Sequence, residues 1–292
     1  MDSLLRDAFT STAVFTVFGV VAGLALAYAA VRFQVEVDPR VAAAKEALPG
    51  ANCGACGFAG CEGYAEAVAT DPDVPTNKCA PGGSATAQKL AGITGKAAAE
   101  AGDSVAILRC ANPGSPQRPK HLYRGLPSCA ASNGAFGGAN ACVYGCIGLG
   151  DCALACPFGA ITMLESRPVI DYRKCTGCNT CVALCPKKVL SLGPRAATTV
   201  IACNNPEKGA SVRAVCEKGC ISCQLCVRKG PEGVYLATEQ GIRVDLVKSI
   251  GLGEETLTPL REACRPKVLH LMAEIRETNA SLSGHKIQGE QR

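Results

Sequence analysis

The stretch Cys175-Thr-Gly-Cys178-Asn-Thr-Cys181-Val-Ala-Leu-Cys185-Pro186 decides the fold class of this chain of 292 residues. Its spacing, C-x2-C-x2-C-x3-C-P, lets one loop supply three thiolates to a [4Fe–4S] cube while the fourth cysteine ligates a neighbouring cube. The proline delays the next helix, so that Cys185 can turn toward that second cube. Zinc, the alternative metal, prefers paired C-x2-C knuckles in closed tetrahedra. The run therefore predicts iron–sulfur clusters, whose usual chemistry is electron transfer.

The composition fits a chain whose fold depends on metal ligation. It has 20 cysteines, 32 glycines and 17 prolines, whereas aromatic residues make up only 4% and no Trp is present. Such a chain builds thin apolar cores, so metal binding must supply much of its folding free energy. A secreted disulfide scaffold is the alternative for a cysteine-rich chain. The cysteines, however, gather in short runs separated by Gly and Pro, and reduced thiols indicate the cytoplasm.

Residues 8–31 contain no charged side chain and are long enough to cross a bilayer as one helix. A helix of that length spans about 36 Å, and a hydrocarbon core is about 30 Å thick. A secretory signal peptide is the alternative, because Ala25-Leu-Ala27 and Ala27-Tyr-Ala29 resemble cleavage sites. The stretch is long for a signal peptide, and Asp7 neutralises the preceding Arg6. We therefore predict a membrane anchor.

Basic residues predict the orientation of this anchor. Arg32, Arg40 and Lys45 follow the apolar stretch, whereas only Arg6 precedes it. The positive-inside rule then places the remainder of the chain in the cytoplasm.

A compact cysteine module follows the anchor. Asp38-Pro39 predicts the start of a short helix that ends before Pro49-Gly50, and a second helix is expected over residues 62–70. Glycines 54, 57 and 60 permit the left-handed backbone with which a loop wraps a cube and directs N–H groups at its sulfurs. The ligands predicted for this cluster 1 are Cys53, Cys56, Cys61 and Cys79.

An internal repeat lies beyond an Ala- and Gly-rich segment and a loop at residues 112–120. The spacing Cys129-x12-Cys142-x2-Gly-Cys146 recurs as Cys203-x12-Cys216-x2-Gly-Cys220. Two copies of one unit predict two ferredoxin-like halves. Strand pairs are expected at 160–163 with 168–171 in the first half, and at 234–237 with 242–245 in the second.

The predicted fold class is α+β: a transmembrane helix, a small helical [4Fe–4S] module and two ferredoxin-like cluster-binding units. The predicted domains are a membrane anchor (1–33), the [4Fe–4S] module (34–95), a linker and cysteine-bearing segment (96–140), a two-cluster ferredoxin-type domain (141–195), a second, degenerate ferredoxin-like unit (196–276) and a mobile tail (277–292).

In crossed ligation, each three-cysteine loop takes its fourth thiolate from the other cysteine run. This rule predicts the ligands of the two clusters in the first half. Cluster 3 is predicted to use Cys156, Cys175, Cys178 and Cys181. In the loop of cluster 2, Leu149 stands where a cysteine is expected, so the nearest upstream cysteine is taken as the fourth ligand. Cluster 2 is therefore predicted to use Cys142, Cys146, Cys152 and Cys185.

The second half is predicted to keep one cluster. Gly230 replaces the cysteine that would ligate the sibling cluster, and no further cysteine run exists near residues 248–253. Cluster 4 is predicted to use Cys220, Cys223, Cys226 and Cys264.

Four scattered cysteines remain after these assignments. The total of 20 divides into five quartets, so a fifth cluster that joins the two halves is a hypothesis, and inert buried thiols are the alternative. Because Cys142 and Cys216 are equivalent in the repeat, their partners could be exchanged. The cluster 5 cysteines are Cys110, Cys129, Cys203 and Cys216.

Basic side chains surround the predicted cluster loops. Between Ile161 and Gly230 there are eleven Lys and Arg but only four Asp and Glu, although the whole chain carries a net charge of only +5. Small bacterial ferredoxins are generally acidic, so this collar predicts a docking site; ordinary solvated side chains are the alternative. The predicted docking residues are Arg173, Lys174, Lys187, Lys188, Arg228 and Lys229.

Other catalytic signals are weak. His121, His270 and His285 have no ligand-like spacing. The glycines of Gly145–Gly150 lack the strand–turn–helix setting of a nucleotide site. We predict no flavin, NAD or ion site in this chain, and no nucleic-acid partner.

These motifs together resemble the B subunit of the Rnf, or Rsx, complexes, which are ion-translocating ferredoxin:NAD oxidoreductases of bacterial membranes. The resemblance rests on the apolar helix followed by Asp38-Pro39, on CGACGFAGCEGYAEAV at 53–68, on NKCAPGG at 77–83 and on the cysteine runs through Pro186. The repeat from Cys203 onward is similar to longer members that append further ferredoxin modules, from which this chain departs at Gly230.

The resemblance implies a cluster-bearing subunit of a translocase. It would accept low-potential electrons from soluble ferredoxin or flavodoxin and pass them toward flavin-bearing partner subunits, while the complex moves Na⁺ or H⁺. Two alternatives stay open at this point: a relay subunit of another membrane reductase or hydrogenase, and a cluster-based redox sensor.

Overall fold

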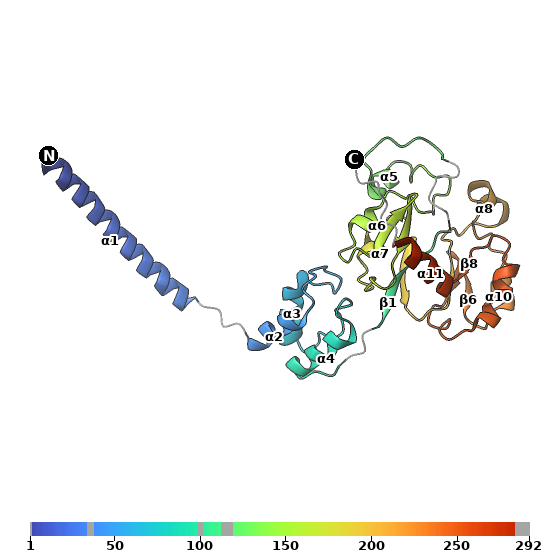
Figure 1. The fold of residues 1–292 in the computed structure, drawn as a ribbon, viewed down its shortest axis with the longest axis horizontal. Helices are drawn as coiled ribbons and strands as arrows, with labels where there is room; N and C mark the ends of the chain where they lie inside the picture. Colours follow the sequence, from blue (N-terminus) through green and yellow to red (C-terminus); the bar gives the residue numbers. More distant parts are fainter. Residues whose placement is uncertain (1, 34–37, 99–101, 112–118, 284–292) are drawn as a thin grey trace.

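The computed structural model describes residues 2–33, 38–98, 102–111 and 119–283, and it mixes helices with short strand pairs (Figure 1). The helices are α1 (Asp2–Arg32), α2 (Pro39–Ala47), α3 (Gly60–Thr70), α4 (Gly83–Thr94), α5 (Cys129–Gly134), α6 (Asp151–Leu154), α7 (Thr180–Leu184), α8 (Gly209–Val215), α9 (Leu225–Lys229), α10 (Glu254–Ala263) and α11 (Met272–Ser283). The strands are β1 (Ser104–Leu108), β2 (Ile161–Leu164), β3 (Arg167–Ile170), β4 (Leu190–Pro194), β5 (Thr199–Ile201), β6 (Tyr235–Thr238), β7 (Gly241–Val244) and β8 (Leu269–Leu271).

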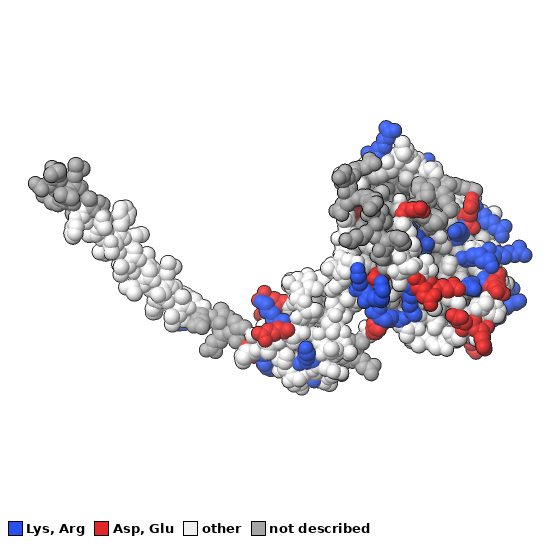
Figure 2. All heavy atoms as spheres, in the orientation of Figure 1, with Lys and Arg blue, Asp and Glu red and all other residues white. Residues whose placement is uncertain are grey.

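The N-terminal apolar helix is confirmed. Within α1, the stretch Thr12–Arg32 is long and apolar enough to cross a membrane. Its large side chains, such as Phe15 and Leu26, are more than two-thirds exposed. Figure 2 shows the middle of α1 without charge, whereas Lys, Arg, Asp and Glu are spread over the rest of the chain.

Helices α2, α3 and α4 pack into a small module after α1. The predicted cap is present, because Asp38 Oδ1 accepts a hydrogen bond of 2.8 Å from the backbone N–H of Arg40. Tyr64, Val68 and Leu90 are fully buried between the helices. The tyrosine hydroxyl donates to the carbonyl of Pro75 at 2.8 Å, so this thin core is tied to the loop that leads to Cys79.

The larger body is built from four antiparallel two-stranded pairs: β1 with β4, β2 with β3, β5 with β8, and β6 with β7. The predicted strand pairs are confirmed as β2–β3 and β6–β7. In the first, Ile161 faces Ile170; in the second, Tyr235 faces Val244 at the same place in the hairpin. We call β1–β4 with α5–α7 the first half, and β5–β8 with α8–α10 the second half.

Strand β1 lies within residues 96–140, which the sequence predicts as a linker and cysteine-bearing segment. It pairs with β4 from Ser104 opposite Pro194 to Leu108 opposite Leu190, and Val105 and Ile107 are completely buried. Its apolar residues fill the core of the first half, so this segment belongs to that half. The predicted loop lies largely outside the described residues.

The two halves share a detailed backbone pattern that the cysteine spacing alone did not reveal. Just after β1, the backbone N–H of Arg109 donates to Val189 at 2.7 Å; just after β5, that of Ala202 donates to Val268 at 2.8 Å. Three residues after Cys185 and after Cys264, a lysine has φ of 50° or 55° and donates back to the carbonyl of that cysteine. Cys185 and Cys264 are therefore counterparts.

Helix α11 links the end of the second half to the first. Asn279, which is buried, donates to the carbonyl of Ile170 in β3 at 3.2 Å, and Met272 is fully buried in the first half's core. Helix α11 extends to Ser283, so the first part of the predicted mobile tail is helical, and Asn279 within it is buried against β3. Residues 284–292 lie outside the described part of the chain.

Candidate metal centres

Cysteines from separate motifs gather into shared hollows. Four hollows are each lined by four cysteines, and of the remaining cysteines Cys156, Cys175 and Cys181 belong to or pack against the core of the first half. Among the described residues, no group of three or more His, Cys, Asp or Glu side chains is arranged to hold a single metal ion. In each hollow the thiols instead surround a common space.

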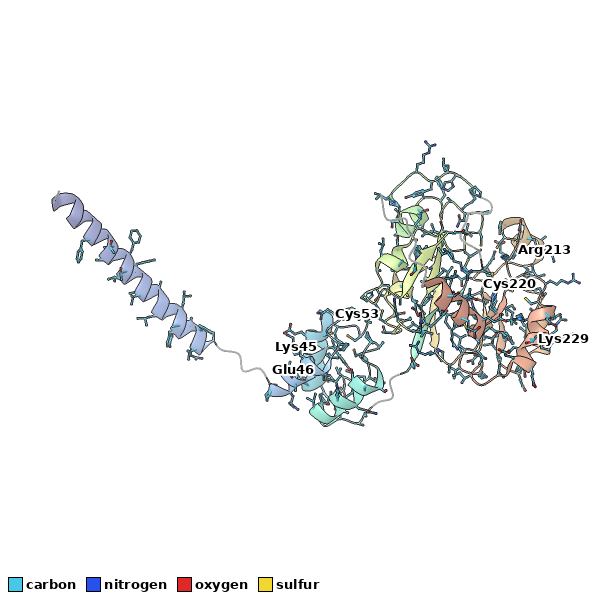
Figure 3. All side chains as sticks on the ribbon, viewed as in Figure 1. Lys45, Glu46, Cys53, Arg213, Cys220 and Lys229 are labelled. Atoms are coloured by element: carbon cyan, nitrogen blue, oxygen red, sulfur yellow. The ribbon has the colours of Figure 1, made fainter. Side chains whose placement is uncertain are left out.

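The quartet predicted for cluster 1 comes together at the N-terminal end of helix α3. Cys53, whose position Figure 3 marks, lines one hollow with Cys56, Cys61 and Cys79. Gly60 has φ of 84°, and a Cβ there would lie 2.9 Å from Asn52 Oδ1. That same oxygen accepts the backbone N–H of Cys61 at 2.8 Å, so only glycine lets the loop close in this way.

The quartet predicted for cluster 3 is the most enclosed. Cys175, Cys178 and Cys181 are each less than 10% exposed, and Cys156 packs against the same core. The backbone N–H of Ala106 in β1 donates to Cys175 Sγ at 3.4 Å, and that of Ala160 donates to Cys156 Sγ at 3.3 Å. Such bonds stabilise thiolate sulfurs, as a bound cluster requires.

The electrostatics of the free thiols show why a cationic partner is needed. Burial, followed by the neighbouring thiolates of Cys175, Cys178, Cys152 and Cys156, raises the pKa of Cys181 to about 12. Burial likewise raises the pKa of Cys152 to about 11, with Cys129 and Cys185 adding to the effect. Four thiolates can share such a site only when iron neutralises their mutual repulsion, so the donor sets fit iron–sulfur clusters.

The quartet predicted for cluster 2 needs one correction. The hollow that contains Cys146, Cys152 and Cys185 is completed by Cys129, whereas Cys142 lines a different hollow. The spacing argument chose Cys142 because it is near in sequence, but the chain turns it away.

Asp151 explains why Cys129 takes that place. Its carboxylate accepts the Ser128 hydroxyl at 3.0 Å, the Cys129 N–H at 2.9 Å and the Ala130 N–H at 3.1 Å. Because Asp151 directly precedes Cys152, these bonds hold the start of α5 against the cluster loop. Cysteine spacing alone did not indicate Cys129. The signal for it is a cysteine that begins a short helix, together with an aspartate in the cluster loop that can cap that helix.

The quartet predicted for cluster 4 comes together in the second half. Cys220, Cys223, Cys226 and Cys264 line one hollow whose remaining walls, apart from Gln224, are apolar and include Ile242 and Leu269. Figure 3 marks Cys220, whose backbone N–H donates to Cys203 Sγ at 3.3 Å.

The remaining hollow lies between the two halves. It is lined by Cys110, Cys142, Cys203 and Cys216, so three of the four cysteines predicted for cluster 5 are brought together and Cys129 is exchanged for Cys142. Burial raises the pKa of Cys142 to about 11, and the thiolates of Cys216, Cys110 and Cys203 contribute in the same direction.

Five of the six predicted docking residues are exposed, and one is half-buried. Lys174, Lys188, Arg228 and Lys229 are exposed, and Figure 3 shows Lys229 at the edge of the second half. Lys187 is half-buried and donates to the carbonyl of Gly137 at 2.6 Å. Arg173 is exposed and pairs with Asp171 at 3.1 Å. Lys187 is thus a structural tie for the loop before Cys142 rather than a free surface charge.

Two families match parts of the chain. The family described as "Putative Fe-S cluster" matches residues 48–81, which contain the complete cluster 1 quartet. The family described as "4Fe-4S dicluster domain" matches residues 141–189, which contain the cysteine runs of the first half. Cys110, Cys129, Cys203 and Cys216 lie outside both matches.

Curated relatives extend the similarity beyond these two segments. The chain is 44% identical over 208 residues to the B subunit of the "Proton-translocating ferredoxin:NAD(+) oxidoreductase complex" of Clostridium ljungdahlii, covering 71% of this chain and 73% of the relative. It is 34% identical over 254 residues to the B subunit of the "Ion-translocating oxidoreductase complex" of Methanosarcina acetivorans, covering 87% and 95%. It is 37% identical over 218 residues to the B subunit of the "Na(+)-translocating ferredoxin:NAD(+) oxidoreductase complex" of Acetobacterium woodii, covering 74% and 65%.

Proposed function

The chain belongs to the family of B subunits of ion-translocating ferredoxin:NAD⁺ oxidoreductase complexes, and we propose that its cysteine quartets relay electrons from ferredoxin toward flavin-bearing partner subunits. Its role as an iron–sulfur electron-transfer subunit of an oxidoreductase follows from that membership. The observation that supports the relay is the gathering of cysteines from separate motifs into sulfur-lined hollows.

The proposed ligands of clusters 1, 3 and 4 are those predicted from the sequence, while cluster 2 takes Cys129 in place of Cys142. Bound there, [4Fe–4S] clusters supply one-electron transfer at low potential. The protein's own contribution is to bury the sulfurs among apolar side chains and to aim backbone N–H groups at them, as Ala106 does at Cys175. Both features tune the potential of a bound cluster.

We propose that α1 anchors the chain in the inner membrane and that residues from Asp38 onward face the cytoplasm. The apolar, uncharged length of Thr12–Arg32 supports the anchor, and the basic residues after it support the orientation. The proposed domains are this anchor, the helical module up to Gly95, and the two halves, with β1 assigned to the first half.

Ferredoxin is the proposed electron donor. The exposed basic residues beside the cluster loops, Lys174 and Lys188 in the first half and Arg228 and Lys229 in the second, support docking of an acidic partner near the sites of electron entry. Lys187 is left out of this surface, because its ammonium is held by Gly137.

The test is reduction of the complete complex by ferredoxin under anaerobic conditions, followed by EPR and by iron and sulfide analysis of this chain. We expect ferredoxin to reduce clusters in this chain, and Cys264→Ala to remove or convert one cluster while the spectra of clusters 1 and 3 persist. Cys226→Ala is the matched variant, which should affect the same cluster. A chain without iron, or one whose clusters stay oxidised while ferredoxin is consumed, contradicts the proposal.

A further inference from the structure

We propose that Cys110, Cys142, Cys203 and Cys216 hold an additional iron–sulfur cluster at the junction of the two halves. This inference rests on the proposed cluster-relay function and deepens it. The four cysteines come from four separate segments, yet they line a single hollow. Each half supplies two of them, so the site is complete only when the halves are joined.

The first pair of ligands occupies equivalent positions in the two halves. Cys110 lies two residues after the end of β1, and Cys203 lies two residues after the end of β5. The residues just before them, Arg109 and Ala202, make matching backbone bonds to Val189 and Val268. The sequence repeats as well: Cys110-Ala-Asn-Pro corresponds to Cys203-Asn-Asn-Pro.

The second pair is equivalent too. Cys142 and Cys216 each begin a C-x2-G-C run. A Cβ on Gly219 would collide with Val212 Cγ1, whereas a Cβ on Gly145 would lie 3.6 Å from Cys142 Sγ, an ordinary contact distance.

This equivalence corrects the repeat seen in the sequence. The x12 spacing pairs Cys203 with Cys129, but Cys129 begins helix α5 whereas Cys203 follows a strand. Cys203 is instead the counterpart of Cys110. The hollow is thus lined by two strand-end cysteines and two loop cysteines, related in pairs by the internal repeat.

Direct bonds hold the two halves together at this site. The backbone N–H of Ala111, next to Cys110, donates to the carbonyl of Ala202, next to Cys203, at 2.8 Å. The side-chain amide of Asn205, which is buried in the second half, reaches Cys142 Sγ of the first half at 3.9 Å. A donor from the second half therefore faces a sulfur of the first, and hydrogen bonds to sulfur tune the potential of a bound cluster.

The experiment is thiol alkylation and iron analysis of the full-length chain in its complex, handled anaerobically and read by mass spectrometry. In the wild type, all four cysteines should resist alkylation, and the chain should hold about twenty iron atoms, four for each of five cubes. In Cys216→Ala, the proposal expects Cys110, Cys142 and Cys203 to become reactive together while Cys129 stays protected. Cys185→Ala is the matched variant and should expose Cys129, Cys146 and Cys152 while leaving Cys142 protected.

The iron lost by double variants is a second test of which cysteines share a cluster. Cys142→Ala combined with Cys216→Ala should lose no more iron than either change alone, because both remove one cluster. Cys142→Ala combined with Cys185→Ala should lose about twice as much. Exposure of Cys129 in Cys216→Ala, or additive loss in the first pair, would overturn the assignment. A wild type with about sixteen iron atoms that ferredoxin still reduces would overturn this cluster alone and leave the proposed relay intact.

Discussion

The first and second halves have the same backbone plan but fill one equivalent region differently. In the first half, Cys156 and the loop Cys175–Cys181 gather sulfurs in the core. In the second half, Gly230 stands at the position of Cys156 and Tyr235 at that of Ile161, and the tyrosine is 2% exposed. The space that sulfurs surround in one half is thus packed by an aromatic ring in the other.

Other positions of the second half that correspond to cluster 3 cysteines of the first half are also occupied by buried or partly buried side chains. Ser249 stands at the position of Cys175, is fully buried, and accepts the Thr198 hydroxyl at its backbone carbonyl. Leu252 packs against the core where a further ligand would follow. The second half therefore has apolar packing and hydrogen bonds in the region where the first half gathers cysteines.

The largest expected difference between the halves appears when iron is removed. Metal binding supplies folding free energy, so anaerobic chelation should lower the opening free energy of β2–β3 by on the order of 5 kcal/mol. The β6–β7 pair should lose less, because Tyr235 and Ile242 remain buried beside it. Amide hydrogen exchange of the full chain, with and without iron, measures both. Equal loss of protection in the two hairpins would contradict the comparison.

Truncation of the aromatic ring should come next in size. Tyr235→Ala leaves a cavity in the second half, and the free energy of unfolding should fall by about 3–5 kcal/mol. Tyr235→Phe is the matched control: it loses only the 3.3 Å bond between the hydroxyls of Tyr235 and Thr199, about 1 kcal/mol. Anaerobic denaturation of the cluster-loaded chain gives both values. If Tyr235→Ala and Tyr235→Phe have the same free energy of unfolding, the aromatic ring does not stabilise the second half in place of a cluster.

Restoring one cysteine should not restore the lost cluster. A Cβ on Gly230 would lie 2.6 Å from the Tyr235 ring and closer still to the carbonyl of Cys226. Gly230→Cys should therefore cost about 1–3 kcal/mol of stability and leave the iron content unchanged. Gly230→Ala should cost a similar amount, because both changes add the same crowded carbon. A gain of iron in the cysteine variant would show that the site is still open.

Charge reversal on the proposed docking surface should have the smallest effect. Lys174→Glu with Lys188→Glu should slow association with reduced ferredoxin by roughly threefold to tenfold, and salt should reduce that difference as charges are screened. Lys89→Glu, an exposed lysine of the helical module, is the matched control. Stopped-flow reduction at several ionic strengths measures these rates. If only Lys89→Glu slows association, ferredoxin docks on the helical module instead.

Local spacing in the sequence was enough to predict the α+β class, the apolar N-terminal helix and the β2–β3 and β6–β7 hairpins. It also predicted which cysteines share a loop, as in Cys53–Cys61, Cys175–Cys181 and Cys220–Cys226. Ligands two to four residues apart lie on one tight turn, and alternating apolar residues between turns favour hairpins, so neighbouring residues already contain this information.

The partners of the isolated cysteines were decided only by the tertiary structure. Cys129 and Cys142 are both close in sequence to Cys146, but only Cys129 lines the same hollow as Cys146, whereas spacing favoured Cys142. Asp151 holds Cys129 beside Cys152, while the pairing of β1 with β4 and of β5 with β8 carries Cys110 and Cys203 to the junction between the halves. Residues far apart in the chain have no characteristic spacing that reveals their contacts. For this physical reason, the sequence suggested how many quartets the cysteines can form but not which isolated cysteines belong together.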